Sequence, residues 1–193
     1  RTELKRLHRE TDSTFVYVTH DQLEAMTLST MVCLMKEGYT QQYAPPLEVY
    51  RKPANTFAAD FVGSPNINLI EAEVETATPL VLKFGTASRL KFTANAPLAL
   101  KEGKQVTLGI RPEHITIVEE GATIEAEIQS SLPSGMETIV ALDLDGIRLH
   151  SVIFGDLDFE VGKLVGLTFK GAGINLFDRE DGRLIAQGTL TKA

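Results

Sequence analysis

Residues 139–153 read IVALDLDGIRLHSVI, which is two apolar, β-branched runs separated by Asp145-Gly146. Asp-Gly between such runs favours a β-hairpin, because both turn positions must accept a positive φ. Asp181-Gly182 separates a second pair of runs in the same way, and Ile124, Ala126 and Ile128 alternate with polar residues. Many short strands with frequent turns predict a β-barrel or sandwich over the later part of the chain.

The composition changes near residue 65. Of the 15 glycines, only Gly38 and Gly63 lie before this point. The segment 63–66, Gly-Ser-Pro-Asn, consists of residues that favour turns. We therefore expect two domains, one over residues 1–65 and a β domain over residues 66–193.

The first 65 residues alternate between helical and strand patterns. Thr14–Thr19 is β-branched and aromatic throughout, which is typical of a strand buried on both faces of a parallel sheet. Asp21 with Glu24 three residues later predicts the start of a helix. The other expected elements are a helix within residues 1–10 with Leu4 and Leu7 on one face, a buried strand at Met31–Met35, its hairpin partner at Tyr39–Tyr43, and helices beginning at Pro46 and Ala54.

Composition and charge exclude several classes of protein. The net charge of −7 argues against a nucleic-acid partner, because phosphate contacts need clustered Lys and Arg. No run of about 18 apolar residues is present to span a bilayer. The only cysteine, Cys33, is expected to be a buried small hydrophobic residue, and a reducing compartment fits. Arg1 is followed by no signal-peptide pattern, so we expect the chain to begin inside a longer protein.

His20 is the residue best placed for chemistry. It follows the expected strand at residues 14–19 and precedes the expected helix, and ligands of open α/β sheets bind at this edge. The helix N-terminus favours an anion and a neutral imidazole, which can donate a hydrogen bond to a phosphate oxygen. The alternative is a histidine that only satisfies a loop carbonyl.

Other candidate groups have structural explanations. Glu113 and His114, within Arg111–His114, lack further ligands at metal-binding spacing, so a corner between strands is the better interpretation. Glu125 with Glu127, and Asp143 with Asp145, are expected to lie on a solvated strand face rather than to form a glycosidase-like pair. The pairs Gly103-Lys104 and Gly162-Lys163 lack the rest of a P-loop. We therefore expect no tight ATP binding, no hydrolysis and no bound cofactor or metal in this chain alone.

A set of short motifs resembles the ATP-binding subunits of carbohydrate-importing ABC transporters of the maltose, glycerol-3-phosphate and multiple-sugar type. The resemblance is dense before residue 65 and sparse but correctly ordered after it. The matching segments are 7–8 (LH), 17–26 (YVTHDQLEAM), 41–42 (QQ), 46–50 (PLEVY), 52–55 (KPAN), 57–59 (FAA), 61–65 (FVGSP), 109–115 (GIRPEHI), 135–138 (GMET) and 176–178 (LFD).

The resemblance implies a fold and a role for each half. Residues 1–65 would be the end of a RecA-like nucleotide-binding domain. In it, His20 would be the switch histidine that contacts the γ-phosphate of ATP. Residues 66–193 would be an OB-like, TOBE-type regulatory barrel, so the whole chain would be α+β and mostly β. The full-length protein would use ATP and Mg²⁺ to drive import of a sugar, polyol or sugar phosphate.

The resemblance also implies partners. These are a second copy through the regulatory domain, permease subunits in the membrane and a regulatory protein. The protein would lie in the cytoplasm against the inner face of the cell membrane. Two other readings remain open from the residues themselves. One is a free-standing OB-like module for a small anion or oligonucleotide, which the acidic charge and the few aromatic residues disfavour. The other is a structural dimerisation tail.

Overall fold

The computed structural model describes residues 3, 6, 10, 11 and 13–193. Contacts between residues divide the chain into two units, residues 1–63 and 64–193, and each unit is described by itself. Of the predicted helix within residues 1–10, Glu3, Arg6 and Glu10 are helical, whereas Leu4 and Leu7 lie outside the described residues. Among the described residues, no helix has the length and apolar character needed to cross a bilayer.

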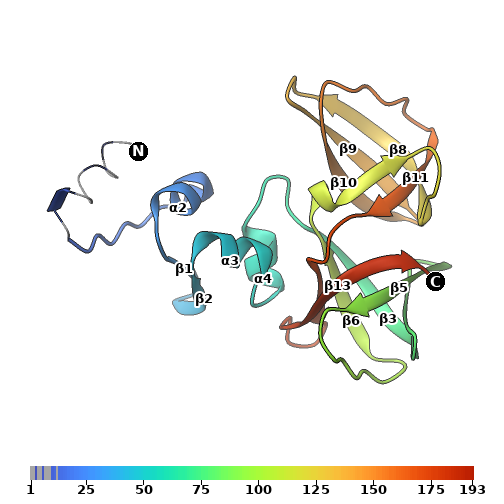
Figure 1. Cartoon of the computed structure of the whole chain (residues 1–193), viewed down its shortest axis with the longest axis horizontal. Coiled ribbons are helices and arrows are strands. Elements are labelled where there is room, and N and C mark those ends of the chain that lie inside the picture. The colour runs from blue at the N-terminus through green and yellow to red at the C-terminus, as the bar shows by residue number, and fades with distance from the viewer. Residues whose placement is uncertain (1–2, 4–5, 7–9, 12) are drawn as a thin grey trace. The chain divides into compact units, whose positions relative to one another are not determined.

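Between residues 13 and 63, the first unit contains three short helices and one β-hairpin. Helix α2 (Gln22–Leu28), strands β1 (Val32–Lys36) and β2 (Tyr39–Ala44), and helices α3 (Pro46–Arg51) and α4 (Thr56–Phe61) follow one another along the chain (Figure 1). The hairpin and the helices after it confirm the predicted elements. Asn55 caps α4 by accepting a hydrogen bond from the Ala58 N–H at 2.8 Å. A small core of Ala44, Val49 and Val62 holds α3 and α4 against the hairpin.

The predicted strand at Thr14–Thr19 is wrong. Residues 13–19 have no regular secondary structure, and Val16 and Val18 are 89% and 90% exposed. A parallel strand needs a hydrogen-bonded neighbour and cover on both faces. Within the described part of the first unit, strand pairing is confined to β1 and β2. The β propensity of residues 14–19 is therefore not realised.

The predicted burial of Met31–Met35 is also wrong, although the strand itself forms. Leu34 is the only buried residue of β1, and Met31, Cys33 and Met35 are exposed. Alternate residues of a strand point to opposite faces. Val32, two residues before Leu34 and on the same face, packs against the core of Ala44, Val49 and Val62, whereas the side chains on the opposite face are exposed. Cys33 is consequently not the buried hydrophobic residue that its neighbours suggested.

The second unit is all β apart from one turn of 3₁₀ helix and confirms the predicted mostly-β fold. A closed barrel has the strand order β12-β13-β5-β4-β3-β6. A five-stranded antiparallel sheet has the order β10-β9-β8-β11-β7. The barrel strands are β3 (Asn68–Ala77), β4 (Leu80–Phe84), β5 (Ser88–Ala94), β6 (Gln105–Ile110), β12 (Ile174–Asp178) and β13 (Leu184–Lys192). The sheet strands are β7 (Ile115–Val118), β8 (Ile124–Pro133), β9 (Glu137–Leu144), β10 (Ile147–Phe154) and β11 (Leu164–Phe169).

The five-stranded sheet is inserted into the barrel sequence. The chain leaves the barrel after β6, passes through the 3₁₀ turn η1 (Pro112–His114), forms the sheet, and returns as β12 and β13 (Figure 1). Both predicted hairpins form, since β9 pairs with β10 and β12 pairs with β13. Asp145 and Gly146 both have a positive φ, whereas in the second hairpin only Gly182 does, within a longer loop. Arg111–His114 is the predicted corner between strands.

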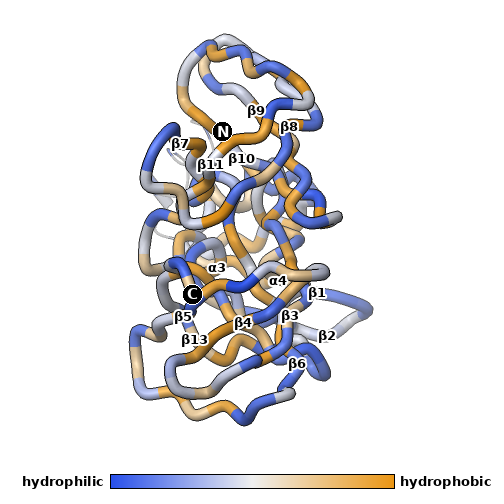
Figure 2. Tube along the Cα trace, turned by 90° about the vertical axis from the view of Figure 1, so that its right-hand side faces the viewer, coloured by the Kyte–Doolittle hydropathy of each residue, from blue (hydrophilic) through white to orange (hydrophobic). Residues whose placement is uncertain are grey.

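Alternating side chains build one core across the barrel and the sheet. In β3, Ile70, Ala72 and Val74 are buried while Glu71 and Glu73 are exposed. The same alternation of apolar and polar residues is visible along other strands of this unit (Figure 2). Buried residues of both layers form a single hydrophobic cluster. The second unit therefore has a core of its own.

Candidate functional site

The segment around His20 is organised by the start of α2. The Asp21 carboxylate accepts a hydrogen bond from the Glu24 N–H at 3.0 Å, which confirms the predicted helix cap. The Glu24 carboxylate accepts hydrogen bonds from the hydroxyls of Tyr17 and Thr19, both at 3.0 Å. The Thr19 hydroxyl also accepts from the Asp21 N–H at 2.9 Å. Glu24 thus draws residues 17–19 onto the first turn of the helix.

The electrostatics of this segment follow from the same contact. The hydrogen bond and the negative charge of Glu24 raise the pKa of Tyr17, because the phenolate would face a carboxylate. His20 lies between these groups, is exposed and belongs to no strand. The expectation that it sits at the carboxyl end of a strand is therefore wrong for this structure. Its predicted contact with a phosphate stays a prediction.

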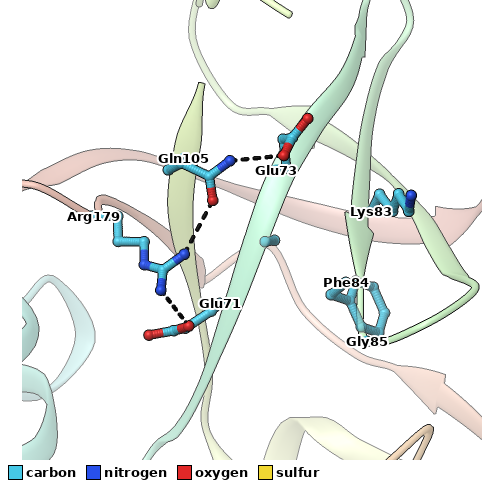
Figure 3. Close-up of a pocket in the computed structure, with 8 residues that line it drawn as sticks. Glu71, Glu73, Lys83, Phe84, Gly85, Gln105 and Arg179 are labelled. Carbon is cyan, nitrogen blue, oxygen red and sulfur yellow. Dashed lines mark hydrogen bonds and ion pairs between the residues drawn. The ribbon is translucent and has the colours of Figure 1, made fainter. Parts of the chain in front are cut away.

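A polar groove of about 310 Å³ opens on the surface of the barrel. Arg179 lies after β12 and donates hydrogen bonds to Glu71 and to the Gln105 side-chain oxygen, the latter at 3.0 Å (Figure 3). The Gln105 amide donates in turn to Glu73 at 2.8 Å. These side chains satisfy one another, so the groove shows no catalytic arrangement. Among the described residues, no group of three His, Cys, Asp or Glu side chains is placed to hold a metal ion.

The junction between the barrel and the five-stranded sheet contains hydrogen bonds from two buried polar side chains, Asn68 and Ser151. The Asn68 side chain, on β3, is 5% exposed and accepts a hydrogen bond from the His150 N–H at 2.7 Å. It donates to the carbonyl oxygens of His150 at 2.9 Å and Ile110 at 3.0 Å. The buried Ser151 hydroxyl donates to the Ile115 carbonyl at 2.8 Å. These side chains therefore fix β10 against the barrel.

The predicted solvated acidic face is only partly confirmed. Glu125 and Glu127 are exposed on β8. Asp145, however, accepts hydrogen bonds from the Thr86–Ser88 turn of the barrel, so its carboxylate is not simply solvated. Sequence reasoning missed this contact and that of Asn68, because their partners lie 42 or more residues away along the chain. The only local signal was the Asp-Gly turn.

Two domain families match the second unit. The MalK OB fold domain matches residues 63–115, and the TOBE domain matches residues 108–177. The sn-glycerol-3-phosphate import ATP-binding protein UgpC 2 of Agrobacterium fabrum is 36% identical over 194 residues, which cover 100% of this chain and 51% of that protein. UgpC of Chromobacterium violaceum is 35% identical over 195 residues, with 100% and 52% covered.

The chain belongs to the family of ATP-binding subunits of ABC importers. It corresponds to a C-terminal portion of such a subunit that carries the OB fold and the TOBE domain. This importer-subunit segment spans about half the length of the curated relatives that it matches. An uncharacterized ABC transporter ATP-binding protein of Bacillus subtilis, YurJ, is 33% identical over 189 residues, covering 93% of this chain and 52% of its own.

A solved structure of the cytoplasmic molybdate-binding protein ModG shows a weaker likeness. It superposes on 56% of the importer-subunit segment and 94% of its own chain, with a TM-score of 0.47 and 13% identity. At this level of likeness no ligand is transferred to the segment. The family assignment depends on the two domain matches and on relatives that align with nearly the whole chain.

Proposed function

We propose that this chain is the C-terminal, regulatory part of the ATP-hydrolysing subunit of an importer for a sugar, a polyol or a sugar phosphate. The observation that carries the proposal is the pair of domain matches, MalK OB fold and TOBE, over residues 63–177. The chain contains no P-loop, so ATP and Mg²⁺ would be bound elsewhere in the full-length protein. The chain alone is expected to show no ATP turnover.

His20 is proposed to be the switch histidine of the full-length protein. Its imidazole would donate a hydrogen bond to the γ-phosphate and help to hold the attacking water. This is positioning and electrostatic stabilisation of a phosphoryl-transfer transition state. Two observations support the role: His20 lies in the segment 17–26 that resembles this family, and its side chain is exposed just before the capped start of α2. An exposed imidazole is free to reach a ligand.

A chimeric protein tests both statements. Residues 1–193 would replace the matching half of UgpC 2 from Agrobacterium fabrum, and ATP hydrolysis would be measured with the purified protein. We expect the chimera to hydrolyse ATP and the His20→Ala chimera to lose about 10²-fold in kcat, as for the loss of one transition-state donor. Lys101→Ala, an exposed loop residue, is the control and should leave kcat unchanged.

The two proposals fail in different ways in this assay. A folded chimera that hydrolyses no ATP, while the parent UgpC 2 does, would contradict the importer function of the chain. An active chimera in which His20→Ala has the same kcat as the unsubstituted chimera would contradict the role of His20 alone.

We further propose that the second unit pairs with a second copy of itself. An apolar row crosses the outer face of the five-stranded sheet, because Leu132 pairs with Ile139 and Ile139 pairs with Val152. Phe154 continues this row on the same face of β10 and is 80% exposed, and Leu132 is 60% exposed. Such a patch favours a protein interface. The other end of the face is charged, with Glu127 opposite Asp143 and Asp143 opposite Arg148.

Light scattering at increasing protein concentration tests the pairing. The wild-type chain should approach the mass of a dimer, and Leu132→Glu should shift the dissociation constant by at least about tenfold by placing a charge in the interface. Glu127→Gln, at the charged end of the same face, is the matched control and should leave the dissociation constant unchanged. A wild-type chain that remains monomeric at high concentration would contradict the proposal.

The remaining partners belong to the whole importer. Permease subunits in the membrane, a regulatory protein bound to the second unit, and a position in the cytoplasm against the inner face of the membrane are proposed from the family. Co-purification of the chimera with the permease of the Agrobacterium system would test the first of these. Loss of the permease from a folded, ATP-hydrolysing chimera would contradict it.

A further inference from the structure

The turn between β9 and β10 reaches across to the barrel through one carboxylate. Asp145 accepts hydrogen bonds from three consecutive backbone N–H groups of the β4–β5 turn: Thr86 at 2.7 Å, Ala87 at 2.8 Å and Ser88 at 3.2 Å. The hydroxyls of Thr86 and Ser88 also donate to it. Five donors from one short turn therefore converge on a single side chain of the neighbouring sheet.

Both turns are shaped around this contact. Asp145 has a φ of 54°, a region in which Asp is among the few tolerated non-glycine residues. On the barrel side, Gly85 has a φ of 58°, and a Cβ added there would lie 2.5 Å from the Asp145 Oδ2 atom. The nearby Asp143 instead accepts from the Gly146 N–H of its own turn at 3.0 Å. Asp145 alone of these two carboxylates bridges the two layers.

Two side-chain contacts thus join the barrel to the five-stranded sheet, and they differ in burial. The Asn68 contact with His150 is made by a side chain that is 5% exposed. The Asp145 contact lies at the surface, since Gly85, Thr86 and Ala87 are exposed. When an exposed carboxylate leaves its donors, water can hydrogen-bond to both sides, whereas a buried amide would be left unpaired.

We propose that Asp145 is a releasable latch between the β9–β10 turn and the barrel, and that Asn68 is the fixed point about which this end of the sheet opens. The Thr86 hydroxyl and the N–H groups of Ala87 and Thr86 hold the pKa of Asp145 well below its usual range, so the carboxylate is charged near neutral pH. The closed latch is then the resting state. When it opens, the turn at residues 85–88 loses its common acceptor.

Amide hydrogen exchange on the whole chain tests the latch. Asp145→Asn keeps the size of the side chain and tolerates the positive φ. Its NH2 group, however, cannot accept hydrogen bonds from the donors of residues 86–88. We expect exchange at the Thr86, Ala87 and Ser88 amides to become at least about tenfold faster, with no change at the His150 amide. Asp143→Asn is the matched control, because its carboxylate bonds within its own turn, and should leave the exchange of residues 86–88 unchanged.

A second variant approaches the contact from the barrel. Gly85→Ala should produce the same local acceleration, and the double variant Gly85→Ala with Asp145→Asn should add little to either change, because both remove one contact. Unchanged exchange at residues 86–88 in Asp145→Asn would overturn the latch. Equal acceleration at residues 86–88 and at His150 would overturn the fixed point, since it would mean that the whole junction loosens.

Discussion

The side-chain amide of Asn68 takes the place of a neighbouring strand. Strand β10 lies at the edge of its sheet, and in the two-residue hairpin the Leu144–Ile147 pair is hydrogen-bonded. Alternation along β10 then points the N–H and C=O of His150 away from β9. Asn68 accepts from this N–H and donates to this C=O, as a peptide group of another strand would. Replacing Asn68 with Ala should therefore leave the N–H and C=O groups of His150 without hydrogen-bond partners inside the protein.

The size of the effect follows from the three hydrogen bonds that are lost. The Asn68 side chain is 5% exposed, so water cannot readily replace it. Leaving one buried donor unpaired costs about 1–3 kcal/mol, and each ordinary hydrogen bond contributes about 1 kcal/mol. Two of the three bonds involve carbonyl oxygens, which tolerate the loss better than the His150 N–H. We expect Asn68→Ala to lower the free energy of unfolding of the second unit by about 3 kcal/mol.

Urea unfolding can report the two units separately. All four tyrosines, Tyr17, Tyr39, Tyr43 and Tyr50, lie in the first unit, so tyrosine fluorescence follows that unit. Far-UV circular dichroism is dominated by the strands of the second unit. Asn68→Ala should lower the midpoint of the circular-dichroism transition by about 1–2 M urea with an unchanged m-value, and leave the fluorescence transition in place.

Asn95→Ala is the matched control. Its side chain makes one exposed hydrogen bond, to the Ala172 carbonyl at 2.7 Å, so the loss should be less than about 1 kcal/mol. Equal midpoints for Asn68→Ala and Asn95→Ala would refute the argument that Asn68 completes the edge of β10. A shift of the tyrosine transition by the same amount would refute the assumption that the units unfold separately.

Two further predictions concern the barrel. Gly188→Ala should lower the free energy of unfolding by at least about 2 kcal/mol, because its Cβ would lie 2.2 Å from the Thr93 carbonyl oxygen. In the same urea titration, the control Gly173→Ala should cost less than about 1 kcal/mol, because the nearest atom to its Cβ would be 3.6 Å away. Lys104, which lies 2.6 Å from Asp178, lowers the pKa of that carboxyl group. The stabilisation is complete above the ordinary carboxyl pKa of about 4 and disappears as the pH falls toward the lowered value, so Asp178→Asn should flatten the acid side of a plot of melting temperature against pH.

The β architecture of the second unit could be predicted because its signals are local. Period-two alternation in β3 and β8 and the Asp-Gly turns at 145–146 and 181–182 specify strands and hairpins from neighbouring residues alone. The insertion of a five-stranded sheet between β6 and β12 was not predicted, since strand order depends on contacts between distant segments. The β1–β2 hairpin and the Asp21 cap of α2 were equally local, and both formed as predicted.

Burial and long-range contacts could not be predicted in the same way. Cys33 lies in an apolar run, but its exposure depends on what covers the second face of β1. Asn68 and Asp145 carry no local sign of their partners, which lie on the other layer of the second unit. Side chains that join layers are specified by the folded chain as a whole. The candidate contacts at this junction therefore emerged only from the structure.

Residues 14–19 do not form the predicted strand, and this affects the proposed role of His20 but not the family assignment. The family assignment depends on residues 63–177 and on alignments that cover the whole chain, so it does not require His20 to follow a strand. The role of His20 does require it, because a switch histidine has to be held beside the nucleotide. Phe15, Val16, Tyr17 and Val18 are 49–90% exposed, so a strand there needs neighbours at its edges and cover on both faces. The relatives are about twice as long as the matched segment, and the chimera has that full length. Exchange of the Val16 and Val18 amides in the chimera shows whether this run becomes a strand: protection there would place His20 at a strand end, and fast exchange in an active chimera would leave catalysis to other residues.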